Sequence, residues 1–402
     1  MKSELPANPV PPLPRSTAGD WRAQIREARR IVIKLGTNVI SRDSGELALG
    51  RVHTLIEEMV DLHRAGRQVI VVASGAISLG MQRLGIGERP QLLPDKQACA
   101  AVGQTRLMAV YQEAFDRYGI ATAQILLTEE DFAVRERYLN LRNTLQRLLQ
   151  LRVIPIVNEN DTISTSEIET FFDRWGGVPH APIFGDNDTL SALVAAKLDV
   201  HVLVLLTDID GLYSAPPDDP AAVLLRVVEK ITPEIEAAAG GGSARGRGGM
   251  RTKVHAARIA ARSGVLTVIA CGAAPGILRR LLRGEDAGTV FLPLPGLSGK
   301  KRWIAFATNV SGRVRVNSGA REALIHRQAS LLFAGVLSLD GDFRRDDVVS
   351  IEGEDGREFA RGIANYSRGE AEPLVGKRTP EIKDRLTAGD DELITRDTIV
   401  IL

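Results

Sequence analysis

Residues 30–37, Arg30-Ile-Val-Ile-Lys-Leu-Gly-Thr, decide the expected fold, because a mostly apolar run with three β-branched residues leads into a glycine turn. Such a run is typical of a strand that is buried on both faces. A helix is expected next, over residues 50–64, since Val52, Leu55 and Met59 recur on one helical face. The segment therefore predicts the first strand–helix unit of an α/β fold.

Strand-like and helix-like segments continue to alternate along the chain. Further strands are expected at 68–73, 123–127, 153–157, 202–206 and 265–270, and helices at 138–149, 189–196 and 252–262. This alternation predicts right-handed crossovers and a mostly parallel central sheet covered by helices on both faces. Ligands of such sheets bind beyond the carboxyl ends of the strands, so we expect the site there.

The alternation stops near the proline-rich stretch 292–299, Leu-Pro-Leu-Pro-Gly-Leu-Ser-Gly. Short strand-like pieces separated by Gly and Asp turns follow it and predict a small, mainly β domain. We therefore expect three parts: a disordered N-terminal extension at 1–28, a catalytic domain at 29–292 and the mainly β domain at 300–402.

Composition excludes several classes of protein. The 402 residues include 51 Lys or Arg and 50 Asp or Glu, for a net charge of +1, which gives no overall field toward nucleic acid or an anionic membrane. Apolar stretches stop well short of the ~20 residues of a membrane span. Two cysteines suit a reducing compartment, so we expect a cytoplasmic protein. The six histidines stand apart, which argues against a metal held by the protein alone.

Glycine turns follow the first two expected strands. Lys34-Leu-Gly36-Thr brings an ammonium group beside exposed N–H groups, an arrangement that suits phosphate, although a surface lysine before a turn is the plain alternative. Ala-Ser74-Gly-Ala opens a helix whose positive end can hold an anion, although a capped helix alone would have the same sequence. A serine-hydrolase elbow would need glycine at position 72, where Val72 stands, so that reading is disfavoured.

Two dense clusters of acids and amides form the next feature. Asn158-Glu-Asn-Asp161 follows an expected strand, and Gly185-Asp-Asn-Asp188 opens an expected helix. Amides can bind a substrate carboxylate or ammonium group, and aspartates can bind an amine or orient lysines. Asx turns and helix caps account for part of one cluster, but two clusters at successive strand ends favour a site.

The last two motifs are Thr207-Asp208, after an apolar strand, and Gly248-Gly-Met-Arg-Thr-Lys253, which enters a helix. The second motif lacks the P-loop spacing, and a linker with an incidental lysine is its plain alternative. Two lysines, amides and aspartates without histidine indicate charge stabilisation. Phosphoryl transfer to a carboxylate fits this set, because an ionised carboxylate needs no general base.

Together these six motifs resemble, in order, those of the glutamate 5-kinases of the amino-acid kinase family. The tail, with Lys301-Arg-Trp-Ile and Val316-Asn-Ser-Gly-Ala, resembles a PUA domain. The resemblance implies an amino-acid-kinase-like sandwich plus a PUA-like domain. It also implies in-line transfer of phosphoryl from ATP to the side-chain carboxylate of glutamate, giving glutamyl 5-phosphate for proline synthesis. Mg²⁺ would arrive with ATP and be held mainly by its phosphates.

The resemblance also implies a role for each matching position. The catalytic residues would be Lys34 and Lys253, which neutralise the moving phosphoryl group, and Asp161, which also orients the lysines. The substrate-binding residues would be Ser74, Asn158, Asp161, Asn187 and Asp188. The ATP-binding residues would be Lys34, Gly36, Thr207, Asp208, Arg247, Gly248, Gly249, Met250, Arg251, Thr252 and Lys253.

The same resemblance implies a homo-oligomer (a dimer or tetramer), feedback inhibition by proline and delivery of the product to glutamyl phosphate reductase. Three departures from the family pattern stand out. Residues 170–182 look like an insertion, Arg247 and Arg251 replace smaller hydroxyl residues, and Asn317 stands where the PUA pattern has Asp.

Two alternatives remain open. A related kinase acting on aspartate, acetylglutamate or UMP would share the lysines and glycines, but it should differ in the acid-amide clusters and lack the PUA-like tail. An RNA-binding protein is the second alternative, since PUA domains often bind RNA. Residues 300–402 hold 17 Lys or Arg and 17 Asp or Glu, and no basic stripe extends beyond 300–302, which argues against RNA.

Overall fold

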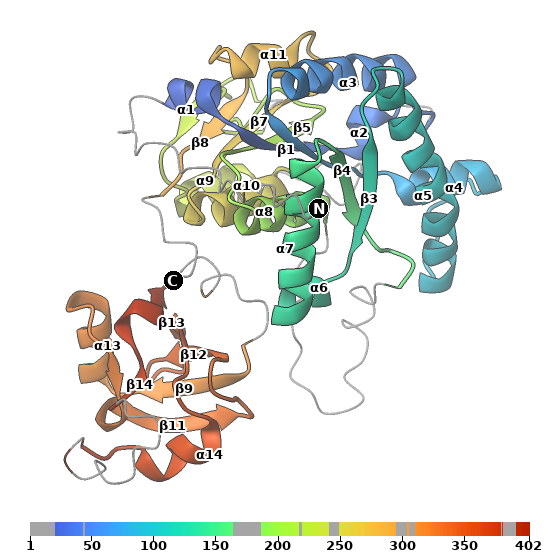
Figure 1. The fold of residues 1–402 in the computed structure, drawn as a ribbon. Coiled ribbons are helices and arrows are strands. Elements are labelled where there is room, and N and C mark those ends of the chain that lie inside the picture. The colour runs from blue at the N-terminus through green and yellow to red at the C-terminus, as the bar shows by residue number, and fades with distance from the viewer. Residues whose placement is uncertain are drawn as a thin grey trace, which may run out of the picture. The chain divides into compact units, whose positions relative to one another are not determined.

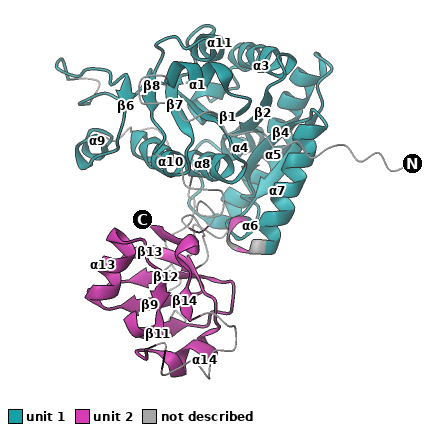
Figure 2. Cartoon of the chain, turned by 60° about the vertical axis from the view of Figure 1, so that its left-hand side comes forward, with its two compact units in different colours: residues 1–131, 136–296 teal, residues 132–135, 297–402 magenta. Residues whose placement is uncertain are grey.

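The computed structural model describes residues 21–42, 45–163, 186–216, 219–240, 249–294, 304, 310–378, 380 and 391–402. The chain divides into two compact units, one of residues 1–131 and 136–296 and one of residues 132–135 and 297–402 (Figure 2). Of the extension expected to be disordered, residues 1–20 lie outside the described residues. Residues 21–27 instead form helix α1, because Trp21 and Ile25, four positions apart, are buried on one face.

The first unit is built on an eight-stranded sheet in the order β3-β4-β2-β1-β5-β7-β8-β6. Neighbouring strands from β3 to β7 are parallel, as expected from the alternation, while β8 is antiparallel to β7. The strands are β1 Arg30–Leu35, β2 Gln68–Val72, β3 Thr122–Leu127, β4 Ile154–Glu159, β5 Val202–Thr207, β6 Val227–Val228, β7 Leu266–Cys271 and β8 Thr289–Phe291.

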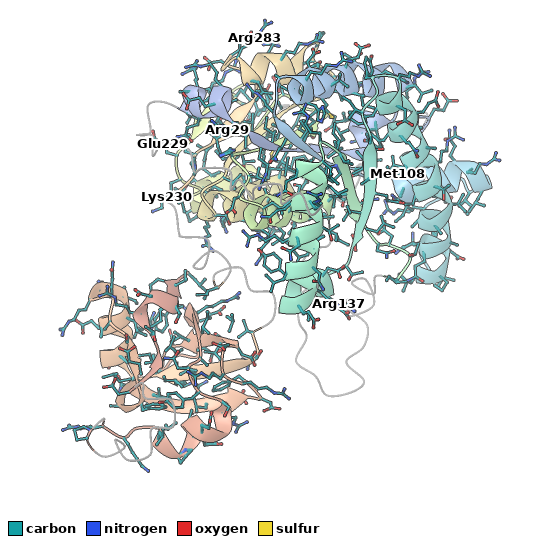
Figure 3. The ribbon with its side chains drawn as sticks, in the orientation of Figure 1. Arg29, Met108, Arg137, Glu229, Lys230 and Arg283 are labelled. Atoms are coloured by element: carbon teal, nitrogen blue, oxygen red, sulfur yellow. The ribbon has the colours of Figure 1, made fainter. Side chains whose placement is uncertain are left out.

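Helices cover both faces of this sheet (Figure 1). One face packs with α1, α3, α5 and α11 in a continuous apolar core, and α8 and α10 lie against the other face. Figure 3 labels Met108 on α5, a partly buried side chain that packs against that core. The helices are α1 Trp21–Glu27, α2 Thr37–Ile40, α3 Leu49–Arg64, α4 Ala76–Leu84, α5 Leu93–Asp116, α6 Glu130–Ala133, α7 Arg135–Gln150, α8 Asn187–Lys197, α9 Pro233–Ala238, α10 Met250–Arg262 and α11 Ile277–Leu282.

Helices α4 and α5 approach each other unusually closely. A Cβ atom at Gly80 of α4 would lie 1.8 Å from the carbonyl oxygen of Cys99, and one at Gly103 of α5 would lie 1.7 Å from that of Ala76. Real atoms cannot approach so closely, so backbone contact between the helices requires glycine at both positions. The two helices therefore pack backbone to backbone at this crossing.

The second unit contains a five-stranded sheet in the order β11-β9-β12-β13-β15 and a two-stranded sheet of β10 and β14. Asn317 caps α13, since its Oδ1 accepts a hydrogen bond of 2.8 Å from the backbone N–H of Ala320. Asparagine thus performs the capping that aspartate could provide. The elements are β9 Gly312–Val316, α13 Ser318–His326, β10 Leu331–Leu332, β11 Val336–Gly341, β12 Val348–Glu352, β13 Glu358–Ile363, α14 Arg368–Ala371, β14 Glu392–Ile394 and β15 Ile399–Ile401.

Candidate active site

A cavity of about 410 Å³ opens at the carboxyl ends of the parallel strands. Lys34 of β1 and Asn158 of β4 contribute to its lining, together with Thr207 of β5 and the N-terminal residues of α4 and α8. This is the position that the sheet topology predicts for a ligand. The full lining is Lys34, Gly36, Thr37, Asn38, Val39, Ser74, Gly75, Ala76, Ile77, Ser78, Arg89, Asn158, Glu159, Asp161, Asp186, Asn187, Asp188, Thr207, Asp208 and Lys253.

A buried carboxylate joins the two lysines that the sequence singled out. Nζ of Lys34 lies 2.8 Å from Oδ1 of Asp188, and Nζ of Lys253 lies 3.1 Å from Oδ2. Thr252 also donates to Oδ2 at 2.7 Å, and the side chain of Asp188 is fully buried. We refer to Lys34, Asp188 and Lys253 as the lysine–aspartate centre. Taken by itself, this centre pairs one anion with two cations, and further carboxylates, among them Asp186 and Asp208, line the same cavity.

Electrostatics keep the carboxylate of Asp188 ionised. Burial alone would raise the pKa of Asp188, but the two ammonium groups outweigh it and lower the pKa to about 2. The neighbouring Asp186 has the opposite shift, because burial and the negative charge of Asp188 raise its pKa. Asp186 also caps α8, accepting from the backbone N–H of Thr189 at 2.8 Å.

A chain of four neutral side chains runs from the cavity wall, where three of them lie, to Gln104 outside the lining. Nδ2 of Asn187 donates to Oγ of Ser74 and to Oδ1 of Asn158, both at 3.1 Å. Nδ2 of Asn158 in turn donates to Oε1 of Gln104 on α5, at 2.8 Å. We refer to these four residues as the amide relay. It starts beside the lysine–aspartate centre, since Asn187 and Asp188 are consecutive in α8.

Glycine turns allow the backbone to line the cavity. The N–H of Gly36 donates to the carbonyl oxygen of Leu206 at 3.3 Å, and a Cβ there would lie 3.3 Å from that oxygen and 3.6 Å from Nζ of Lys34. Gly75 has a φ of 99°, a left-handed conformation that favours glycine, and it precedes the first residue of α4. Both turns leave backbone at the cavity edge that a bulky residue would cover.

The end of β5 supplies an ionised acid. Oδ1 of Asp208 accepts from Thr207 at 2.9 Å, and Oδ2 accepts from Asn38 at 2.8 Å. Burial alone would raise the pKa of Asp208, but these hydrogen bonds hold the pKa below its usual value. The part of the chain that the structure describes has no group of three or more side chains that could hold a metal ion by themselves.

The structure brings most of the expected site residues together, with one difference of arrangement. The sequence assigned the orientation of both lysines to Asp161, whereas in the structure Asp188 bridges them. Asp161 lines the same cavity from the segment after β4. Gly249, Met250 and Arg251 lie at the start of α10 outside the lining, while Thr252 reaches Asp188. Arg247, Gly248, Gly185 and the expected insertion at 170–182 fall outside the described residues.

Sequence reasoning missed Gln104, Asn38 and Arg89. Arg89 lines the cavity from the segment between α4 and α5. Gln104 is a polar residue at a buried position of α5. A buried polar residue indicates a function, but its burial can be recognised only once the helix is placed against the sheet. Asn38 belongs to the short helix after the first glycine turn. Asparagine is common in turns, so its presence there does not by itself indicate a site.

The arrangement suits the movement of negative charge between two small molecules. Two ammonium groups and backbone N–H groups can neutralise charge that develops on phosphoryl oxygens. Amides and carboxylates around the rest of the lining can orient a polar substrate. Among the described residues, no helix is both long and apolar enough to cross a membrane.

Comparison with known proteins supports this picture. Residues 29–271 match the amino acid kinase family, and residues 312–386 match the PUA domain. The chain is 47% identical to the glutamate 5-kinase of Moorella thermoacetica over 392 residues, which is 96% of this chain and 100% of the relative. It is 45% identical to that of Pelobacter propionicus (95% of this chain, 100% of the relative) and 44% identical to that of Myxococcus xanthus (96% and 100%).

Proposed function

Because the chain belongs to the glutamate 5-kinases of the amino acid kinase family, we propose that it transfers the γ-phosphoryl group of ATP to the side-chain carboxylate of glutamate. The product would be glutamyl 5-phosphate, and the reaction would serve proline synthesis. The observation that carries the proposal is the lysine–aspartate centre at the edge of a cavity lined by amides and acids.

We propose that the lysine–aspartate centre acts on the moving phosphoryl group. An ionised carboxylate attacks without a general base, so the barrier depends on alignment and on neutralising charge. Lys34 and Lys253 come from distant parts of the chain, and the buried Asp188 holds both ammonium groups at one place. Each correctly aimed donor of this kind can contribute roughly 3 kcal/mol to transition-state stabilisation.

The nucleotide is proposed to bind on the side of the cavity formed by Gly36, Thr207 and Asp208. Mg²⁺ would enter with ATP, held mainly by phosphates, and would neutralise part of their charge. Asp208 would be the carboxylate available to the metal, because its two oxygens accept from the neutral side chains of Thr207 and Asn38, whereas both oxygens of Asp188 face ammonium groups. Glutamate is proposed to bind at Ser74, Asn187 and Asp161, on the amide side.

An assay of ATP consumption over glutamate, aspartate, acetylglutamate and UMP tests the proposal directly. Hydroxylamine added to the reaction traps an acyl phosphate as a hydroxamate. We expect a hydroxamate with glutamate and a much lower rate with the other three. Equal or higher turnover of aspartate, acetylglutamate or UMP would contradict the assignment. The homo-oligomer, inhibition by proline, a reductase partner and a cytoplasmic location stay predictions from the resemblance.

A further inference from the structure

The direction of the amide relay determines what the cavity presents to a substrate. A side-chain amide has a donor end and an acceptor end, so a chain of amides can run in either of two directions. In the direction found here, Nδ2 of Asn187 donates hydrogen bonds to Ser74 and Asn158. Oδ1 of Asn187 is buried and has no hydrogen-bond partner among the described residues. A buried acceptor without a donor is costly, so a ligand that supplies a donor would gain from it.

Gln104 occupies the far end of the relay, away from the lysines. Its Oε1 accepts from Nδ2 of Asn158, and this hydrogen bond turns Oδ1 of Asn158 toward Asn187. Gln104 and Asn158 are buried, with 9% and 1% of their surfaces exposed. Gly103, the residue before Gln104, is where the backbones of α4 and α5 touch, so the position of Gln104 is fixed by helix contact.

The lining around Asn187 favours a cation as the missing donor. Asp186 precedes Asn187, Glu159 is the last residue of β4, and Asp161 follows that strand, whose residue Asn158 bonds to Asn187. The negative charge of Asp188 is already balanced by two lysines. Burial raises the pKa of Asp186, and a nearby positive charge would oppose that shift.

We propose that Gln104 is a positioning residue that fixes the direction of the amide relay, so that Oδ1 of Asn187 accepts a hydrogen bond from the α-ammonium group of the substrate. The inference rests on the proposed function and adds a source of selectivity to it. If the relay ran the other way, Nδ2 of Asn187 would face the ligand and favour a carboxylate. A residue that never touches the substrate would thus select amino acids over plain dicarboxylic acids.

The test compares glutamate with glutarate, which has the same two carboxylates and no ammonium group. The measured quantity is the ratio of the inhibition constant of glutarate to the KM for glutamate. Gln104→Met removes the acceptor at similar size, and Gln104→Glu keeps an acceptor that cannot donate when ionised. Thr105→Val is the control, because Thr105 is the next residue of α5, is exposed, and donates its hydroxyl to the carbonyl oxygen of Ala101 in the same helix.

We expect Q104M to lower this ratio about tenfold, the fold-change that one hydrogen bond to a charged group can provide, with the KM for ATP unchanged. Q104E and T105V should keep the ratio within about threefold of the wild type. If Gln104 had a merely structural role, its loss would weaken the binding of both ligands equally, and the ratio would not change. Should Q104M fail to fold, Gln104→Lys, which donates and cannot accept, forces the reverse direction and is expected to lower the ratio as well.

An unchanged ratio in a folded Q104M, or in Q104K, would overturn the inference. If Q104E lowered the ratio as much as Q104M does, the role assigned to the hydrogen-bond acceptor of Gln104 would be overturned. These results are distinct from failure of the proposed function, which would appear as a wild-type protein that forms no hydroxamate from glutamate.

Discussion

The lysine–aspartate centre and the amide relay meet at consecutive residues of one helix, yet one is built from charged groups and the other from neutral groups. Asp188 is fully buried and ionised, and it gathers two cations. Asn187 is neutral, and its neighbours in the relay are neutral too. Charge that appears in a transition state is best met by fixed charge, whereas a ground-state ligand can be selected by the orientation of dipoles. In the proposed mechanism, the first turn of α8 would therefore contribute to both rate and selectivity.

The largest effect is expected from Lys253→Ala, which tests whether the lysine–aspartate centre acts on rate. Loss of this ammonium group removes half of the cationic pair, and we expect kcat to fall about 10³-fold or more. The fold should persist, because Asp188 keeps Lys34 and Thr252 as partners. Steady-state kinetics with thermal melting measure both effects. The control is Lys230→Ala at an exposed position labelled in Figure 3, and near-normal turnover in K253A would remove Lys253 from the mechanism.

Asp188→Asn tests the anion that holds the centre together. The variant leaves two buried ammonium groups without their counter-charge, so we expect about 3–5 kcal/mol lower unfolding free energy and about 10²-fold lower kcat. Asp116→Asn, at an exposed position, is the control and should change neither quantity. Unfolding at neutral pH and steady-state kinetics check these values.

The same variant should change acid stability with a definite sign. The folded pKa of Asp188, about 2, lies below its ordinary value of 3.8, so the carboxylate stabilises the fold above the ordinary value. That contribution is lost as the pH falls from 3.8 toward 2. The wild type should therefore lose stability more steeply than D188N in this window. Parallel slopes in acid unfolding curves would contradict the ionised, paired state of Asp188.

On the amide side, Asn187→Ala should affect binding more than rate. We expect the KM for glutamate to rise roughly 10-fold to 30-fold, since contacts to a polar substrate are lost, while the KM for ATP stays within about threefold. Asp161→Asn should act in the same direction, and Asn143→Ala, at an exposed position of α7, serves as control. A fall in kcat without any change in the KM for glutamate would place Asn187 on the side of the lysines.

The smallest expected effect is at Arg89, which lines the cavity but is exposed. Water screens an exposed charge, so Arg89→Gln should raise the KM for glutamate less than about fivefold. Arg83→Gln, an exposed change at the end of α4, is the matched control. If R89Q raised the KM for glutamate more than N187A does, charge and not dipole orientation would select the substrate.

Local patterns were sufficient to predict the parallel strands and the helices that carry the motifs. The apolar runs at 31–33 and 202–206 indicate buried strands, and Gly36, two positions after Lys34, indicates a turn. Helix α5 was not predicted, because it packs on α4 through glycines as well as on the core, so its apolar residues do not form one clear stripe. The antiparallel strand β8 is three residues long and carries little pattern of its own.

The candidate site could be located from sequence, but its internal arrangement could not. Lys34 and Lys253 stand out because each adjoins a glycine-rich turn or loop and a strand or helix end. Which acid lies between them depends on how α8 packs against β1 and α10, and that information is tertiary: Asp188 and Asp161 look alike in sequence. Gln104 is 54 positions from Asn158, so nothing local connects them.

The crossing of α4 and α5 has a consequence for how this chain can be redesigned. Gly80 and Gly103 touch no ligand in the proposed mechanism, yet even a methyl group at either would force the two helices apart. One helix follows Ser74 and the other carries Gln104, so the separation would be transmitted to both sides of the pocket. In a library that varies every position, these two glycines should tolerate as little as the lysines do, for reasons of space alone.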